Sequence, residues 1–176
     1  MIKTLIVYYS KTGFTKRYAE WLAQALNCDC VRYEERGQVD FNAYDVLIFG
    51  SWCHAGRILK LNWLWEMQKK HPQKHYAVFA VGASPMASPD VKTAMEKNVP
   101  PESAVKSFYL QGGLNYEKMG FASKTMMKML CTSLEKKPNR TPQEEQMLNM
   151  ISHSYDISDQ ALIEPIVEFV QQLKKA

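Results

Sequence analysis

The sequence predicts an α/β fold, a three-layer sandwich whose five-stranded parallel sheet has the strand order 2-1-3-4-5. Five short apolar runs rich in β-forming residues alternate with segments of helical periodicity, which is typical of βαβ units. Right-handed crossovers then leave few strand orders. Hydrophobic residues make up 46% of the 176 residues, enough for the buried core of one domain. We therefore expect a single domain over residues 1–176.

The five strands are expected where the apolar runs are too short for helices. Several runs are almost continuously apolar, as in strands that are buried on both faces. The expected strands are Thr4–Tyr9, Cys30–Tyr33, Asp45–Gly50, His75–Val81 and Lys106–Leu110.

Helices are expected between the strands, because apolar side chains recur there every three or four residues. Ser88 and Pro89 suit the N-cap and first position of a helix that ends at Asn98. The final helix is expected to begin near Ser158. The stripes are Tyr18, Trp21, Leu22, Ala25 and Leu26, then Leu61, Leu64 and Trp65, and finally Ile163, Ile166, Val167 and Val170.

Residues 114–157 form an expected insertion after the fifth strand, since they are too numerous for a structureless loop. Met126, Met129 and Leu130 would share one helical face, and Thr141 with Glu144 predicts a capping box. We favour a satellite core helix with a solvated lysine face. The alternative is an adaptable methionine surface for an apolar ligand, with lysines that attract an anionic substrate or a membrane surface.

Composition excludes several classes of protein. The net charge of +4 is mild for a nucleic-acid-binding protein, so no nucleic acid partner is expected. The four cysteines, Cys28, Cys30, Cys53 and Cys131, form no zinc motif, and no metal is expected. Cys28 and Cys30 should be buried free thiols on one strand face. No apolar run reaches the roughly 18 residues of a membrane span, and no signal peptide is evident, so we expect a cytoplasmic location.

The segment between the first strand and the first helix combines three features of a phosphate site. Ser10, Thr12 and Thr15 supply hydroxyl donors, Gly13 allows close backbone approach, and the helix offers unpaired N–H groups. The segment also lies where this strand order places its ligand crevice. It matches neither a Walker A loop nor a G-x-G-x-x-G fingerprint, so ATP, GTP and a Rossmann-type NAD site are not expected. The alternative is an ordinary polar turn.

Residues 7–15, Val-Tyr-Tyr-Ser-Lys-Thr-Gly-Phe-Thr, resemble the phosphate loop of flavodoxins, with its [ST]-x-T-G-x-T core. In that family the loop binds the phosphate of FMN. The resemblance implies a flavodoxin-like fold in which FMN is bound by Ser10, Lys11, Thr12, Gly13, Phe14 and Thr15.

Residues 44–56 resemble the flavodoxin segment that leads to the flavin ring. The expected cofactor contacts there are Ser51, Trp52, Cys53, His54 and Gly56. Gly50 would permit a tight exit from the strand. Trp52 offers a flat ring for stacking, although a core or homodimer-interface role is the alternative. His54 is a candidate proton donor to the flavin, against the alternative of a solvated loop histidine.

A third loop, with Gly82, Ala83 and Ser84, is expected at the other edge of the ring. It lacks the acidic and aromatic residues of electron-carrier flavodoxins. The segments Gln111–Tyr116 and Met126–Leu130 are similar to the flavodoxin-like branch that contains menaquinone-dependent protoporphyrinogen oxidase. Members of that branch carry a long insertion after the fifth strand.

These observations favour an FMN-dependent oxidoreductase that transfers electrons or hydride to or from a quinone or porphyrinogen-like substrate. The chemistry would belong to the flavin, since no protein-borne nucleophile or acid–base dyad is evident. The expected partner is a redox protein or small-molecule acceptor. One alternative is an electron carrier without a substrate of its own, and another is a binding module that has lost the cofactor.

Overall fold

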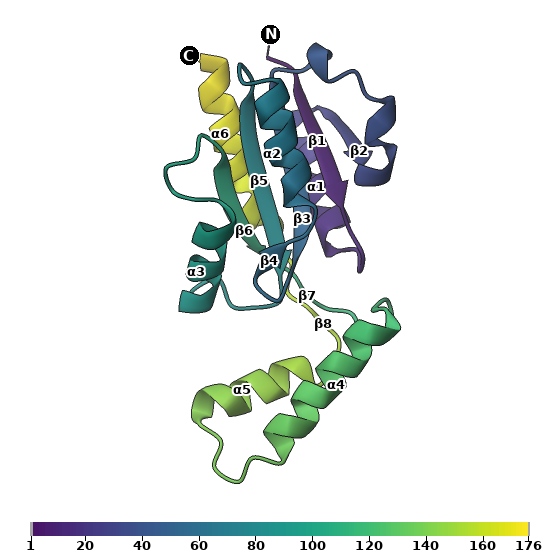
Figure 1. Cartoon of the computed structure of the whole chain (residues 1–176), viewed down its shortest axis with the longest axis vertical. Coiled ribbons are helices and arrows are strands. Elements are labelled where there is room, and N and C mark those ends of the chain that lie inside the picture. Colours follow the sequence, from purple (N-terminus) through teal and green to yellow (C-terminus); the bar gives the residue numbers. More distant parts are fainter. Residues whose placement is uncertain (1, 176) are drawn as a thin grey trace.

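The computed structural model describes residues 2–175 and shows a parallel sheet with helices on both faces (Figure 1). The strand order is β2-β1-β3-β5-β6, and the two-residue strand β4 pairs antiparallel with β3. The five parallel strands therefore have the predicted order 2-1-3-4-5. Their bounds are β1 Thr4–Tyr9, β2 Asp29–Arg32, β3 Val46–His54, β5 His75–Gly82 and β6 Lys106–Gln111.

Helices α1 and α6 cover one face of the sheet, and α2 and α3 lie on the other (Figure 1). The predicted caps are confirmed: Ser88 accepts a hydrogen bond from the Asp90 amide, and Thr141 and Glu144 form a reciprocal capping box. The helices are α1 Phe14–Leu26, α2 Leu61–Lys70, α3 Pro89–Asn98, α4 Phe121–Glu135, α5 Pro142–Ile151 and α6 Glu164–Lys175.

The sheet separates two hydrophobic clusters. Ile6 of β1 packs among residues of α1 and α6, whereas its neighbours Leu5 and Val7 pack with residues of α2. Side chains alternate between the faces of a strand, so a strand covered on both sides needs apolar residues throughout. This requirement explains the continuous apolar run of β1.

Two boundaries differ from the sequence prediction. Strand β2 ends at Arg32, and Tyr33 begins a 3-10 helix that extends to Gln38. Helix α6 begins at Glu164, several residues after the expected Ser158, because a 3-10 turn over Gln160–Ile163 precedes it. The Asp159 carboxylate accepts a hydrogen bond from the Ala161 amide and so stabilises this turn instead of the first turn of α6.

The prediction that the third strand ends at Gly50 was wrong. Strand β3 continues to His54 and forms a hairpin with β4, Arg57–Ile58, through a turn at Ala55 and Gly56. Gly50 consequently lies inside β3 and does not form an exit from the strand. The ring of Phe79 occupies the space where a side chain at Gly50 would project.

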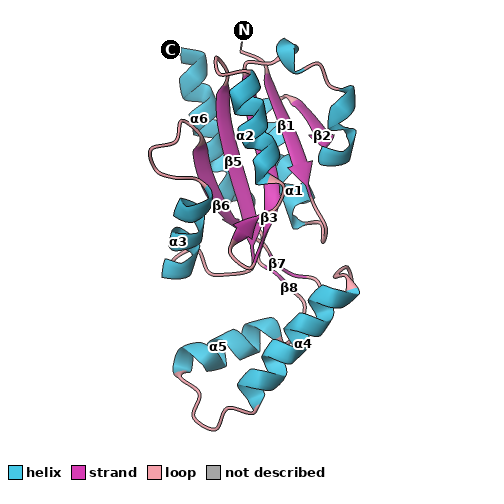
Figure 2. Cartoon of the chain, viewed as in Figure 1, coloured by secondary structure: helices cyan, strands magenta, loops and turns pink. Residues whose placement is uncertain are grey.

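The insertion stands away from the carboxyl edge of the sheet (Figures 1 and 2). An antiparallel ribbon of β7, Gly113–Leu114, and β8, Tyr155–Asp156, joins the α4–α5 hairpin to the sheet. The expectation of a satellite core helix was wrong, because no residue of α4 is buried. The two helices contact each other and leave large apolar side chains exposed: Phe121, Met126, Met129, Leu130 and Met147.

The expected burial of Cys28 and Cys30 was wrong, because both are only half-buried, and Cys28 precedes β2. Both pack against the cluster under α1 and α6, as predicted for side chains on one face. Burial raises the pKa of these thiols to about 11 and about 12, which makes them poor nucleophiles. None of the helices within residues 2–175 is both long and apolar enough to cross a bilayer.

Candidate functional site

An open cavity of about 430 Å³ lies between the carboxyl edge of the sheet and the insertion. This volume is within the range of small-molecule sites, about 300–1,000 Å³. Its lining contains eleven of the fourteen predicted site residues, all except Ser10, Gly13 and Ser51. The eleven are Lys11, Thr12, Phe14, Thr15, Trp52, Cys53, His54, Gly56, Gly82, Ala83 and Ser84.

The loop from Ser10 to Gly13 joins β1 to α1 at one end of this cavity. Gly13 has φ of 106°, a conformation that L side chains rarely adopt, and no side chain caps α1. The first amides of α1 therefore lack a capping partner from the chain. The Ser10 hydroxyl oxygen is buried and has no hydrogen-bond partner among the described residues. An anion with several acceptor oxygens would satisfy these donors.

Ser51 has a structural role in this fold. Its side chain is fully buried, and its hydroxyl donates a hydrogen bond of 2.7 Å to the carbonyl of Leu59. The side chain therefore holds the segment after β4 against β3 and does not line the cavity.

Trp52 is half-buried and lines the cavity. Its indole N–H is buried without a hydrogen-bond partner among the described residues. The His54 ring lies edge-on to the indole, with 5.5 Å between ring centroids, and the Lys11 ammonium lies 5.6 Å from the indole centroid. A buried donor without a partner costs free energy, so an acceptor supplied by a ligand would stabilise this indole.

Asn98, which the sequence analysis did not identify, fixes the β3–β4 turn. Its side-chain nitrogen donates to the backbone carbonyl of Gly56 at 2.7 Å, and its side-chain oxygen Oδ1 accepts from the Ile58 amide at 2.9 Å. Asn98 is the last residue of α3, so the turn beside Trp52 is tied to a helix on the sheet face. An asparagine near a helix end gives no sequence signal of such a distant contact.

Two tyrosines that the sequence analysis also missed hold the third loop. The hydroxyl of Tyr109 donates to the carbonyl of Ser84 at 2.9 Å, and that of Tyr155 donates to the carbonyl of Ala83 at 3.0 Å. Burial raises the pKa of both tyrosines, so the hydroxyls remain protonated donors at neutral pH. Tyr155 lies in β8, so this bond also joins the base of the insertion to the loop.

The insertion supplies an apolar wall to the cavity. This wall is formed by Met119, Met126, Met127, Leu130, Met147 and Ile151. Methionine side chains are flexible and polarizable, and they fit apolar ligands of varied shape. The sequence indicated this role through the methionine-rich segment, which was the less favoured of the two interpretations of the insertion.

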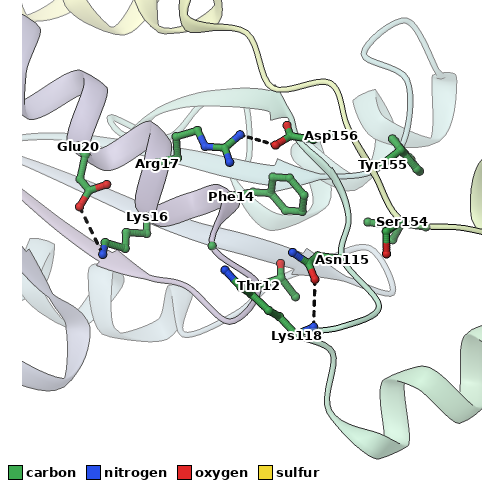
Figure 3. A pocket seen from close by; sticks show the side chains of 12 residues that line it. Thr12, Phe14, Lys16, Arg17, Glu20, Asn115, Lys118, Ser154, Tyr155 and Asp156 are labelled. Carbon is green, nitrogen blue, oxygen red and sulfur yellow. Dashed lines mark hydrogen bonds and ion pairs between the residues drawn. The ribbon is translucent and has the colours of Figure 1, made fainter.

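A second cavity of about 520 Å³ shares Thr12, Phe14 and Leu114 with the first, and five of its lining residues are charged (Figure 3). Lys16 pairs with Glu20 at 3.5 Å, and Arg17 pairs with Asp156 of β8. Burial alone would raise the pKa of Asp156, but hydrogen bonds from Ser158 and Arg17 hold that pKa below its usual value. This ion pair joins α1 to the base of the insertion.

Comparison with known families identifies the domain. A protein-family model described as a flavodoxin domain matches residues 5–141. The chain belongs to the flavodoxin family. The flavodoxin match contains all three loops that line the cavity and ends before α5. A search of curated proteins gave no significant match.

Solved structures similar to this flavodoxin-family chain include a protein described as a flavoprotein from Bacteroides eggerthii. It is 20% identical with a TM-score of 0.44, over 62% of this chain and 87% of that one. The Trp repressor binding protein from Bacillus subtilis is 13% identical with a TM-score of 0.47, over 79% and 100%. A WrbA-like flavodoxin from Agrobacterium tumefaciens is 22% identical with a TM-score of 0.40, over 49% and 63%.

Proposed function

We propose that this protein binds FMN in the cavity at the carboxyl edge and acts as an oxidoreductase toward an apolar acceptor. The observation that carries the proposal is that one cavity combines Trp52, the methionine wall of the insertion and four residues of the loop before and at the start of α1: Lys11, Thr12, Phe14 and Thr15. Membership in the flavodoxin family supports the cofactor, and the wall supports an acceptor besides the cofactor.

The residues around the phosphate loop fit the proposed cofactor. Ser10, Thr12, Thr15 and the first amides of α1 would bind the phosphate, and the unpartnered Ser10 hydroxyl is consistent with this role. Trp52 and the third loop would border the ring system. When bound, the flavin would supply the hydride or electron transfer, while the chain would orient it and exclude water. His54, which lies beside Trp52, stays the candidate proton donor.

The acceptor that we propose is a quinone or a porphyrinogen-like molecule. The methionine wall would contact the apolar body of such a molecule without requiring one fixed shape. We propose, on the same basis, a relation to the branch that contains menaquinone-dependent protoporphyrinogen oxidase, whose members carry an insertion at this position. In this chain the insertion follows β6, the fifth strand of the parallel sheet.

An electron carrier is the second candidate, and the charge of the insertion favours it. Lys124, Lys128 and Lys136 form no ion pair among the described residues, so they could dock an acidic redox protein. Direct turnover with a soluble quinone would favour the enzyme. Electron transfer that occurs only with an acidic protein partner, at a rate that falls steeply as the salt concentration rises, would favour the carrier.

The first test is the absorbance spectrum of purified protein with added FMN, before and after dialysis. Retained bands near roughly 375 and 450 nm, where oxidised flavins absorb, would support the cofactor. A protein that stays colourless after dialysis would contradict the proposal and favour a module that binds another anion.

A further inference from the structure

We propose that Lys118, in the insertion, completes the phosphate site by placing its ammonium group against the loop of Thr12 and Gly13. The inference rests on the proposed function, since the anion is the phosphate of FMN. It adds a residue from outside the loop of residues 10–15, and it gives the insertion a role in binding the cofactor.

The position of the Lys118 side chain is the first observation. A Cβ atom built on Gly13 would lie 3.8 Å from Lys118 Nζ, so the ammonium group is next to the backbone of the loop. Figure 3 shows the side chain extending from the insertion toward Thr12. The Lys118 amide donates to the side-chain oxygen of Asn115 at 3.0 Å, which fixes the backbone from which the lysine projects.

The second observation is that Lys118 has no carboxylate partner. Lys118 lines the second cavity, of about 520 Å³, together with two other cations. Among the described residues, those two cations are paired: Lys16 with Glu20, and Arg17 with Asp156. Lys118 forms no such pair. Gly13 therefore faces a positive charge that no carboxylate neutralises. The same loop also contains the buried Ser10 hydroxyl, which lacks a partner among the described residues.

A reciprocal contact runs from the loop to the insertion. A Cβ atom at Gly120 would lie 3.1 Å from Lys11 Nζ, so the Lys11 side chain reaches the start of α4. Lys11 is likewise without an ion pair among residues 2–175. The junction of the loop and the insertion thus carries two ammonium groups without carboxylate partners, and a dianionic phosphate bound there would attract both.

Phosphate recognition and the position of the insertion should therefore be coupled. FMN would draw Lys118 toward the loop and bring the methionine wall with it, because both belong to the same insertion. Riboflavin has the same ring system without the phosphate, and it would gain nothing from Lys118. The comparison of FMN with riboflavin therefore isolates this contact.

The test is the dissociation constant of FMN and of riboflavin, measured by flavin fluorescence with the full chain and with K118Q, K118R and K128Q. Lys128 is another exposed lysine of the same insertion, and it lines neither cavity, so K128Q controls for the change in net charge. We expect K118Q to weaken FMN about tenfold, as for loss of one charge-assisted hydrogen bond. Riboflavin binding should stay unchanged, K118R should restore most of the FMN affinity, and K128Q should bind FMN like the unmodified chain.

Two results would overturn the inference alone: K118Q that binds FMN as tightly as the unmodified chain, or an equal loss for FMN and riboflavin, which indicates a structural role. The salt dependence gives a second measurement, and the FMN affinity of K118Q should fall less steeply with salt. An unmodified chain that binds no FMN would instead overturn the proposed function, and this inference with it.

Discussion

At the scale of single residues, the candidate site depends on small groups at fixed backbone positions. Gly13 permits the left-handed conformation that begins α1, and the Ser10 hydroxyl in the same loop is buried without a partner among the described residues. Asn98, Tyr109 and Tyr155 act at a distance, since each binds a carbonyl of a loop that borders the cavity. The effects of single substitutions on ligand affinity and on folding stability can therefore be measured separately.

Thr12→Val should weaken FMN at least tenfold, because it replaces a half-buried hydroxyl that lines the cavity by a methyl group of similar size. One hydrogen bond to a charged group contributes on the order of 1.5–3 kcal/mol. Equilibrium titration with FMN checks this, and the thermal unfolding of the apoprotein should not change. An unaltered affinity would mean that the phosphate lies elsewhere.

Gly50→Ala should destabilise the fold by about 1–3 kcal/mol, the usual cost of overpacking a core. The new methyl group would overlap the ring of Phe79, which is fully buried and has little room to move. Gly37→Ala is the matched control, because nothing lies within 4 Å of a Cβ at that position. Urea unfolding measures both, and equal free energies of unfolding for the two variants would contradict the expectation.

At the scale of elements, the β3–β4 hairpin and the β7–β8 ribbon determine the shape of the cavity. The hairpin carries Trp52 and His54, and the ribbon positions the methionine wall. Neither element is long enough to be stable alone, so each depends on contacts with the main sheet or its helices.

Ala55→Asn should stabilise the protein by about 0.5–1 kcal/mol. Ala55 has φ of 47° and Gly56 has φ of 75°, the two positive values of a type I′ turn, in which Asn-Gly is the preferred pair. Asparagine tolerates this conformation better than alanine does. Thermal unfolding of the two proteins gives the comparison, and a lower midpoint for the asparagine variant would refute this reading of the turn.

At the scale of the whole molecule, the protein consists of a packed sheet and an insertion joined to it by few polar contacts. The Arg17–Asp156 ion pair and the Tyr155 hydrogen bond lie at that junction. The exposed methionines of the α4–α5 hairpin indicate that burial of side chains contributes little to the stability of this hairpin. The insertion should therefore respond to conditions that leave the sheet intact.

Acid should weaken this junction. The folded-state pKa of Asp156 is lowered, so its contribution to stability is present above the ordinary aspartate pKa of about 3.9 and is lost as the pH falls through the folded value. Asp156→Asn should therefore be less stable than the unmodified protein at pH 7, with a gap that closes below about pH 4. Thermal unfolding across this pH range tests the expectation, and a gap that does not depend on pH would contradict it.

The sequence by itself determined the fold and the place of the site. Alternation of apolar runs with helical stripes gave the strand order, because buried strands and amphipathic helices leave periodic patterns. The phosphate-loop pattern located the candidate site at the first connection, and its flavodoxin resemblance agrees with the family match. The caps at Ser88 and Thr141 were also predictable, because capping uses neighbouring residues.

Only the tertiary structure decided features that depend on residues far apart in the chain. The extension of β3 past Gly50 was missed because it depends on pairing with β1, β4 and β5. The ring of Phe79, on the neighbouring strand β5, explains why a glycine lies inside β3. The approach of Lys118 to Gly13 and the bonds of Asn98 and Tyr109 join segments separated by many residues. Sequence patterns report local periodicity and local hydrogen bonding. Which distant side chains meet is set by the packing of elements, so it became visible only in the folded molecule.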